Sequence, residues 1–359
     1  MIEFNFEKLR AIGLTQYVVN QLGALPPLQL QHHSASRLMR VVETQRDTFG
    51  LHDGDAERHA RALPRVLNAL QTQETAITVG DWVVTEPDAS GGLWITVRLD
   101  PVTQIARRAN DGRRQPLASN VNTALLVMGL DADFNPRRLE RTIAMVRACD
   151  VAPVVVLTKA DLAPDARQRI AQVCARLPAT LPVLAVNALS REAHREIAPW
   201  LHPGHTLVLL GSSGAGKSTL TNTLTHRAGQ ATGGVRLGDG RGRHTTTARS
   251  LHLCAEGACI VDTPGLRTWR PDADAQSLAA TFGDVQAWAL QCQFRDCRHE
   301  AEPGCAVRGH VEADRLLNYQ KLLRDAQRGE QTPLQRMALR QRWKAIGKAG
   351  RERLREKRG

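Results

Sequence analysis

The sequence predicts a multidomain chain in which a small β-barrel is followed by an α/β domain and then by a short cysteine-rich helical segment. Three observations predict this order. Short stretches with period-2 alternation occupy residues 36–115, and apolar strands alternate with helices from about residue 120. Three cysteines and a histidine then cluster within residues 292–305. A chain of 359 residues has room for two or three domains, with a sizeable core in at least one of them.

Residues 1–35 form an N-terminal extension with a helical pattern that ends at Pro26 and Pro27, and the sequence gives it no role. Within residues 36–115, the segment 93–99 alternates apolar with polar side chains, which predicts a half-buried strand. The segment 77–85 is similar but is interrupted by a turn at Gly80. Several short strands predict a small barrel, for which the OB-fold is one candidate among small β modules.

Residues 116–285 predict a mainly parallel sheet with helices on both faces. The predicted strands are 123–130, 154–157, 183–186, 207–210 and 260–261, and the predicted helices are 136–149 and 164–176. A hairpin is expected around Glu256 and Gly257.

A phosphate-binding loop follows the strand 207–210. The segment GSSGAGKST matches GxxxxGK[ST] at the strand-to-helix junction that this pattern requires. We expect its backbone N–H groups to surround phosphate oxygens, Lys217 to reach the β- and γ-phosphates and Ser218 to hold Mg²⁺. The loop consists of Gly211, Ser212, Ser213, Gly214, Ala215, Gly216, Lys217, Ser218 and Thr219.

A guanine-reading motif, TKAD, closes the strand 154–157. The carboxylate of Asp161 is able to accept hydrogen bonds from N1–H and the N2 amine of guanine, whereas adenine lacks this donor pair and would leave the carboxylate unpaired. Lys159 is expected to lie along the base plane. Thr158 stands where most GTPases have the longer Asn. The motif consists of Thr158, Lys159, Ala160 and Asp161; the alternative is an ordinary polar loop after a strand.

The guanine motif precedes the phosphate-binding loop, which is the reverse of the usual order in a GTPase, so the sequence predicts a circularly permuted P-loop GTPase domain. The motif DTPG then closes this domain. Asp262 is expected to hold Mg²⁺ through water, and Gly265 is expected to donate its N–H to the γ-phosphate. Asn187 and Ala188 come after the strand 183–186, which follows TKAD. They fit the last base-contacting loop, where a backbone N–H meets guanine O6.

Residues 240–247 (GRGRHTTT) lie where a nucleotide-sensing switch belongs. One of its three consecutive threonines is expected to complete the Mg²⁺ shell, and Thr246 is assigned to this position. Leu266 follows DTPG where Ras-type enzymes have the glutamine that orients water, so intrinsic hydrolysis is expected to be slow. His244 is the candidate catalytic group, with an exposed loop histidine as the alternative.

The cysteine-rich segment has the pattern C-x4-C-x-H-x5-C. Three thiolates and one imidazole predict a closed, structural Zn²⁺ site, one per chain. The segment 286–330 is too short to bury a large core, so metal binding should supply much of its folding free energy. A helical apolar stripe over residues 316–323 is expected to pack on it. The ligands are Cys292, Cys297, His299 and Cys305.

Charge predicts a polyanionic partner. The formal net charge is +12, and residues 331–359 carry ten Lys or Arg against two Glu, which defines a basic C-terminal tail. A solvated helix is the alternative for the tail. No run approaches eighteen apolar residues and no leader pattern opens the chain, so a cytoplasmic protein without membrane contact is expected. The protein is also expected to be a monomer. The remaining cysteines are expected to be buried thiols: Cys149, Cys174, Cys254 and Cys259.

The motifs TKAD, GSSGAGKST, GRGRHTTT and DTPG and the Cys3His cluster, in this order, resemble those of the RsgA (YjeQ/EngC) family of bacterial GTPases that depend on the small ribosomal subunit. The resemblance covers about residues 36–330. It implies an N-terminal OB-fold, a circularly permuted GTPase domain and a C-terminal zinc finger. It further implies action in late maturation of the small subunit, with hydrolysis of GTP to GDP and phosphate stimulated by that subunit and with the basic tail contacting rRNA.

This sequence departs from the family pattern in three places: Asn122 stands where an acidic residue is common, Asn187 and Ala188 replace a loop that usually contains Ser, and the N-terminal extension is long. Two other classes remain open. A metabolic P-loop kinase would be indifferent to guanine, and an RNA-binding protein that uses nucleotide only as a structural switch would show no significant turnover.

Overall fold

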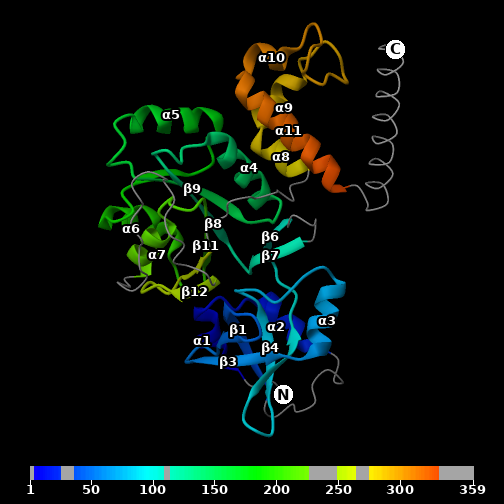
Figure 1. The fold of residues 1–359 in the computed structure, drawn as a ribbon, viewed down its shortest axis with the longest axis vertical. Coiled ribbons are helices and arrows are strands. Elements are labelled where there is room, and N and C mark those ends of the chain that lie inside the picture. The colour runs from blue at the N-terminus through cyan, green and yellow to red at the C-terminus, as the bar shows by residue number, and fades with distance from the viewer. Residues whose placement is uncertain (1–3, 26–35, 109–113, 226–248, 264–274, 331–359) are drawn as a thin grey trace, which may run out of the picture.

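The computed structural model describes residues 4–25, 36–108, 114–225, 249–263 and 275–330. Figure 1 shows an elongated molecule, with the barrel at one end, the α/β domain in the middle and a helical C-terminal unit at the other end. The predicted fold class is confirmed in all three parts. In the described part of the chain, no helix is both long enough and apolar enough to cross a membrane.

The N-terminal barrel is closed by five strands. Their hydrogen-bonded order is β1-β2-β3-β5-β4, and β4 pairs again with β1. Alternate side chains of these strands, with Val66 and Leu70 from the helix α3, fill the barrel interior. The predicted OB-fold is therefore confirmed. The bounds are β1 Arg37–Thr44, β2 Phe49–His52, β3 Glu57–Ala62, α3 Pro64–Thr72, β4 Trp82–Pro87 and β5 Leu93–Arg98.

The N-terminal extension, for which no role was predicted, forms the helices α1 Phe6–Ala11 and α2 Gln16–Gly23. They pack on the core through buried Leu9, Ile12 and Val18. Between the barrel and the α/β domain, β6 Gln104–Arg108 and β7 Arg114–Ser119 form a separate antiparallel hairpin. The domain boundary predicted at residue 116 falls inside β7, and the boundary at 286 falls inside α9 Gly283–Ala289.

The α/β domain has the strand order β10-β9-β8-β11-β13-β12, in which only β12 runs antiparallel. Because this parallel sheet is covered on both faces, its strands are apolar throughout rather than alternating. Helices α4 and α5 cover one face, and α6 and α7 cover the other. The strand bounds are β8 Thr123–Gly129, β9 Ala152–Thr158, β10 Val183–Val186, β11 Thr206–Leu210, β12 Arg249–Leu253 and β13 Cys259–Asp262. The helices are α4 Pro136–Arg147, α5 Ala166–Arg176, α6 Arg191–Ile197, the 3-10 turn Ala198–Trp200 and α7 Lys217–Thr225.

The sheet order confirms the circular permutation. The strand that leads into the phosphate-binding loop, β11, lies in the middle of the sheet between β8, which precedes it in the chain, and β13, which follows it. The guanine motif at the end of β9 therefore meets the phosphate-binding loop at the carboxyl ends of the parallel strands. The barrel joins the sheet at the strand β12, because β1 pairs with β12 through Glu43 and Thr44.

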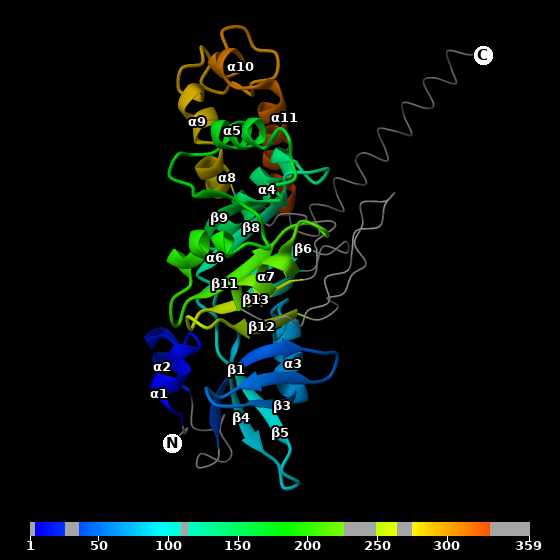
Figure 2. The same cartoon turned by 90° about the vertical axis from the view of Figure 1, so that its left-hand side faces the viewer.

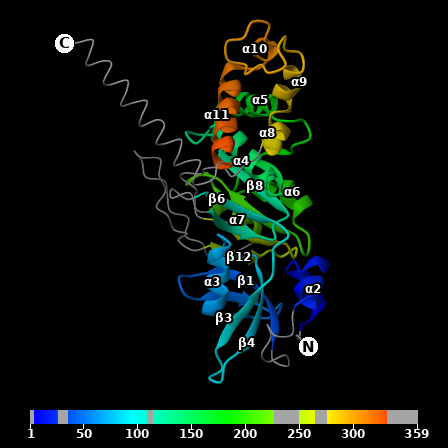
Figure 3. The same ribbon diagram turned by 90° about the vertical axis from the view of Figure 1, so that its right-hand side faces the viewer.

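The C-terminal unit packs on α4. Its helices are α8 Ala275–Thr281, α9, α10 Ala306–His310 and α11 Ala313–Glu330. The predicted apolar stripe is confirmed, since Leu316, Tyr319 and Leu322 are buried in a core shared with Ala144 of α4. Figure 3 shows α11 running beside α4. Cys254 and Cys259 are buried as expected, and Cys149 is half-buried. Cys174 is exposed because it lies on the outer face of α5, so the expectation is wrong for Cys174.

Candidate nucleotide and metal sites

The phosphate-binding loop joins β11 to α7 in a conformation that requires its glycines. A Cβ at Gly211 would lie 2.2 Å from the carbonyl oxygen of Val127 in β8, a contact that no other residue type would tolerate. Gly216 has φ +95°, in the left-handed region. The ammonium group of Lys217 donates to the carbonyl oxygens of Gly211 (3.0 Å) and Ser212 (2.7 Å). The lysine thus folds back across its own loop, on the side where phosphate oxygens bind.

Two opposite charges lie buried at this loop. Lys217 is 6% exposed, and burial lowers its pKa to about 8. Asp262, at the end of β13, is fully buried, and burial raises the pKa of its carboxyl group to about 6, although the nearby Lys217 lowers it. Among the described residues, neither carboxylate oxygen of Asp262 has a hydrogen-bond partner. A buried carboxylate without partners is costly unless a cation joins it.

This carboxylate fits the Mg²⁺ ion that a P-loop GTPase uses. Asp262 pairs in register with Leu209 of the phosphate-loop strand, and the hydroxyl of Thr263 donates to the Leu209 carbonyl (2.7 Å), which fixes the end of β13. Ser218 lies on the first turn of α7, beside Lys217. Carboxylate, hydroxyl and water oxygens are the ligands that Mg²⁺ prefers. The buried, unpartnered carboxylate of Asp262 therefore fits a bound Mg²⁺ ion.

The guanine motif is tied to the phosphate-binding loop by two side chains. The hydroxyl of buried Thr158 donates to the carbonyl oxygen of Ala215 (2.6 Å). The ammonium group of Lys159 donates to the carbonyl oxygen of Gly214 (2.8 Å), and its backbone has a left-handed φ of 59°. Thr158 thus has an anchoring role that the sequence did not reveal. A threonine at this position is short enough to hold the loop directly.

The carboxylate of Asp161 lies beside the second base-contacting loop. Its Oδ2 accepts a hydrogen bond from the side-chain amide of Asn187 (3.0 Å), while the Asn187 Oδ1 accepts from the backbone N–H of Leu189 (2.9 Å). The carbonyl oxygen of Ala188 accepts from the hydroxyl of Thr223 in α7 (2.7 Å). The structure therefore brings together TKAD, residues 187–188 and the phosphate-binding loop, as the sequence predicts.

Two carboxylates that were not predicted as site residues contact these loops. Asp131 accepts a hydrogen bond from the Lys159 ammonium group (2.6 Å), and Asp133 accepts one from the Ser212 hydroxyl (2.5 Å). Both follow β8, the strand next to β11. The carboxyl ends of neighbouring parallel strands lie side by side. The position of these acidic residues directly after a predicted strand could therefore have indicated that they lie near the phosphate-binding loop.

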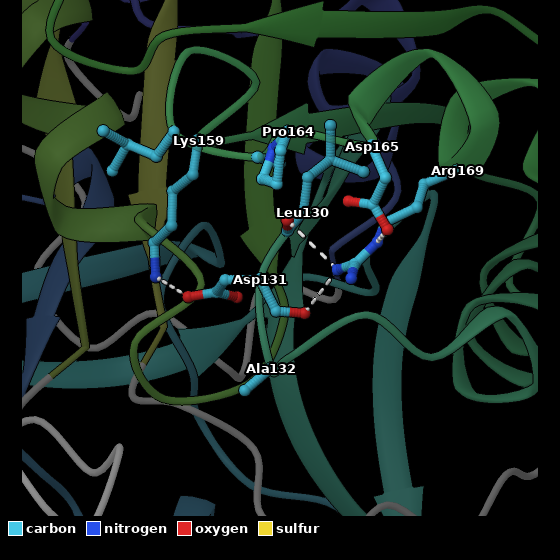
Figure 4. Close-up of a pocket in the computed structure, with 9 residues that line it drawn as sticks. Leu130, Asp131, Ala132, Lys159, Pro164, Asp165 and Arg169 are labelled. Carbon is cyan, nitrogen blue, oxygen red and sulfur yellow. Dashed lines mark hydrogen bonds and ion pairs between the residues drawn. The ribbon is translucent and has the colours of Figure 1, made fainter.

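A cavity of about 730 Å³ opens beside the guanine motif (Figure 4). The stem of Lys159 forms one wall, and Pro164, Asp165 and Arg169 lie opposite. Asp161 and the described residues of the phosphate-binding loop do not line it. The cavity thus adjoins the predicted base site without containing the groups that would read the base.

Several predicted site residues lie outside the described residues. They are His244, the threonines 245–247 that include the assigned Mg²⁺ ligand Thr246, Gly265, Leu266 and the basic tail 331–359.

The Cys3His cluster is assembled. The ligand atoms of Cys292, Cys297, His299 and Cys305 all lie within 4.8 Å of one another. His299 Nδ1 is 3.6 Å from the sulfur of Cys292 and 3.5 Å from that of Cys305, and these two sulfurs are 4.0 Å apart. Ligands about 2.3 Å (sulfur) and about 2.0 Å (nitrogen) from a tetrahedral ion would be roughly 3.5–3.8 Å apart. The cluster therefore has the spacing needed to hold a metal ion.

Short helices and side chains around the cluster hold its loop in place. Cys292 follows α9, and Cys305 is the residue that precedes α10. The side-chain amide of Gln320 in α11 donates to the carbonyl oxygen of His299 (3.0 Å). Trp288 stacks on His310 with ring centroids 3.6 Å apart. The loop is thus supported by three helices of the C-terminal unit.

The RsgA GTPase family matches residues 99–271. The small ribosomal subunit biogenesis GTPase RsgA 2 of Vibrio vulnificus is 40% identical over 320 residues, which cover 86% of this chain and 88% of that protein. The small ribosomal subunit biogenesis GTPase RsgA of Xanthomonas oryzae pv. oryzae is 42% identical over 324 residues, covering 88% of each.

Two solved structures share the fold. YjeQ from Thermotoga maritima has a TM-score of 0.58 and 22% identity, and the match covers 81% of this chain and 98% of that one. YloQ, a circularly permuted GTPase, has a TM-score of 0.55 and 21% identity over 84% of this chain and 99% of that one. With relatives at 40–42% identity over most of its length and with the nucleotide loops assembled as described, this chain belongs to the RsgA family of circularly permuted GTPases.

Proposed function

We propose that this protein hydrolyses GTP to GDP and phosphate on the small ribosomal subunit during late subunit maturation in the cytoplasm, and that the subunit stimulates the hydrolysis. The observation that carries the proposal is the junction of TKAD with the phosphate-binding loop through Thr158 and Lys159. It supports the proposal because Asp161, which we propose reads guanine, belongs to the same motif that contacts the loop proposed to bind phosphate. The relatives named as small ribosomal subunit biogenesis GTPases support the choice of partner.

In this proposal, the nucleotide is held by three groups of residues in 116–285. Asp161 reads the base with Asn187 and Ala188, the loop 211–219 holds the phosphates, and Gly265 senses the γ-phosphate. Asp262, Ser218 and Thr246 hold Mg²⁺, which neutralises charge on the β- and γ-phosphates when bound. His244 is proposed as the group that orients water once the subunit is bound, because Leu266 is apolar.

The other segments are proposed to face the ribosome. The OB-fold, residues 36–115, is of a class that binds nucleic acid, and the unit 286–330 holds one structural Zn²⁺. The protein is proposed to act as a monomer. Its basic tail, residues 331–359, is proposed to contact rRNA through its positive charges. Each phosphate that the tail neutralises releases counterions, so binding of the subunit should weaken steeply with salt.

The decisive experiment measures GTP turnover by the full chain with and without purified small subunits. A strong rise in turnover on addition of subunits, absent with large subunits, is expected. The alternative, an RNA-binding protein that uses nucleotide as a structural switch, predicts subunit binding without significant turnover. A metabolic kinase predicts equal use of ATP and GTP. Failure of small subunits to stimulate turnover contradicts the proposed function.

A further inference from the structure

The loop between β8 and α4, residues 130–135, has no part in the function proposed above, yet it lies against both nucleotide loops. Figure 4 shows Asp131 pointing toward Lys159 of the guanine motif. The same loop carries Asp133, whose carboxylate meets Ser212 of the phosphate-binding loop. We refer to residues 130–135 as the β8–α4 loop.

Asp131 holds Lys159 from one side. Its Oδ2 lies 2.6 Å from the Lys159 ammonium group, which also donates to Gly214. Partial burial tends to raise the pKa of Asp131, but the hydrogen bond from Lys159 prevails and lowers it. A lysine side chain has four rotatable bonds, and ordering them on binding costs conformational entropy. Because Asp131 fixes the ammonium end of Lys159, part of this entropy is already lost before the base binds.

Asp133 holds the phosphate-binding loop in the same way. Its Oδ1 accepts from the hydroxyl of Ser212 (2.5 Å) and from the guanidinium group of Arg138 (2.6 Å). The carboxylate is only 15% exposed. Because Ser212 lies at the start of the loop, this bond fixes the point where the chain leaves β11 and begins to turn around the phosphates.

The β8–α4 loop is itself rigid. The guanidinium group of Arg169 donates to the carbonyl oxygens of Leu130 (3.2 Å) and Asp131 (2.9 Å), as Figure 4 shows. The other carboxylate oxygen of Asp131 accepts from the backbone N–H of Asp133 (3.0 Å). Asn135 caps α4 by accepting from the N–H of Arg138. Each carboxylate is therefore oriented by contacts that do not involve the nucleotide.

We propose that Asp131 and Asp133 are positioning residues for nucleotide binding: Asp131 acts through Lys159 on the base, and Asp133 acts through Ser212 on the phosphates. The proposal rests on the proposed function, because it assumes that guanine nucleotide occupies these loops. Negative charge near phosphate would ordinarily repel it. Here each carboxylate is paired with a cation, Lys159 or Arg138, so its charge is offset before the nucleotide arrives.

The two residues should have different effects. Loss of the Asp131 contact frees the side chain that lies along the base, so the preference for GDP over ADP should fall. Loss of the Asp133 contact loosens the phosphate-binding loop, so GDP and ADP should weaken by the same factor. A purely structural role would lower thermal stability but would leave the preference for GDP over ADP unchanged in the Asp131 variant and the affinity for both nucleotides unchanged in the Asp133 variant.

The test uses the full chain and the release rate of a fluorescent GDP analogue. Asp131→Asn keeps the shape of the side chain but removes its charge, and release should become about five- to tenfold faster, since a charge-assisted hydrogen bond is lost at a half-exposed site. The double variant with Lys159→Met should release GDP no faster than Lys159→Met alone, because Asp131 acts through that lysine. Likewise, the double variant of Asp133→Asn with Ser212→Ala should release GDP no faster than Ser212→Ala alone.

Asp55→Asn is the matched control. Asp55 lies between β2 and β3 of the barrel and forms an exposed ion pair of 2.7 Å with Lys8 of α1, so its loss should leave release unchanged. Parental release by Asp131→Asn and Asp133→Asn, or rate effects that simply multiply in the double variants, would overturn the proposal. A parent chain that binds no guanine nucleotide would refute the proposed function as well, whereas a parent that binds normally confines the failure to this inference.

Discussion

Replacement of Asp262 by Asn should stabilise the nucleotide-free protein and abolish its response to Mg²⁺. The Asp262 carboxylate is fully buried, lacks a hydrogen-bond partner among the described residues, and has its pKa raised by burial from 3.8 to about 6. This rise is about two pKa units, and each unit corresponds to about 1.4 kcal/mol. The ionised carboxylate therefore costs the folded protein about 3 kcal/mol.

The sign of the pH dependence follows from the direction of this pKa change. Below about pH 4 the carboxyl group is protonated in the folded and unfolded states, and it costs nothing. As pH rises from about 4 to 6, the unfolded chain ionises first, so folding stability falls, and the full cost is present above pH 6. Asp262→Asn cannot ionise. It should match the parent near pH 4 and exceed it by up to about 3 kcal/mol at pH 8.

Urea unfolding of the full chain, without Mg²⁺ or nucleotide, measures this difference across the pH range. Saturating Mg²⁺ and GDP should reverse it, because a ligand stabilises only the protein that binds it, by RT ln(1 + [L]/Kd). The parent should gain stability, and Asp262→Asn should gain little. A variant that is less stable than the parent at pH 8 in the absence of ligand, or a difference that does not change with pH, would refute the reasoning about this carboxylate.

Three further predictions concern the other sites. Asp161→Asn should lower the preference for GTP over ATP, and unchanged discrimination in competition binding would contradict the assignment of TKAD. Removal of metal by a chelator should unfold the segment around the cysteine cluster but preserve GDP affinity, and metal analysis well below one ion per chain contradicts the site. Glu140→Ala should cost about 3–5 kcal/mol in free energy of unfolding, against less than about 1 kcal/mol for the exposed ion-pair variant Asp165→Asn.

Much of the fold could be predicted because its signals are local. The strand 183–186 was predicted with the bounds that β10 has, and α4 begins at Pro136, where a proline at the first helical position follows the capping residue Asn135. Of the segment 77–85, only the part from Trp82 onward is a strand. Gly80 has φ +92°, and the Asp81 carboxylate accepts from the N–H of Thr78, which makes a tight turn before β4.

The contacts between loops could not be predicted, because they join residues far apart in the sequence. TKAD and the phosphate-binding loop are each recognisable motifs, but the bond between Thr158 and Ala215 depends on the distance between β9 and β11 across the sheet. Glu140 likewise looks like a surface residue of an amphipathic helix. It is 1% exposed because side chains far away in the sequence pack on it, among them Arg176 and Arg315, the latter 175 residues later. Long-range packing of this kind leaves no periodic signal.

Helix α4 explains why metal removal should spare the nucleotide site. Its first turn is held by the β8–α4 loop beside the phosphates, while its middle carries Glu140, which binds Arg315 (2.5 Å) and the side-chain amide of Asn318 (2.6 Å) of α11. These hydrogen bonds do not involve the metal ligands, and of the four ligands only Cys292 and Cys305 pack against the apolar core that contains Leu316 and Tyr319. The packing of α11 on α4 is therefore stabilised by hydrogen bonds and apolar contacts that do not require a bound metal ion. Loss of the metal should release the loop that carries the four ligands, while α11 stays bound and α4 keeps its place behind the phosphate-binding loop.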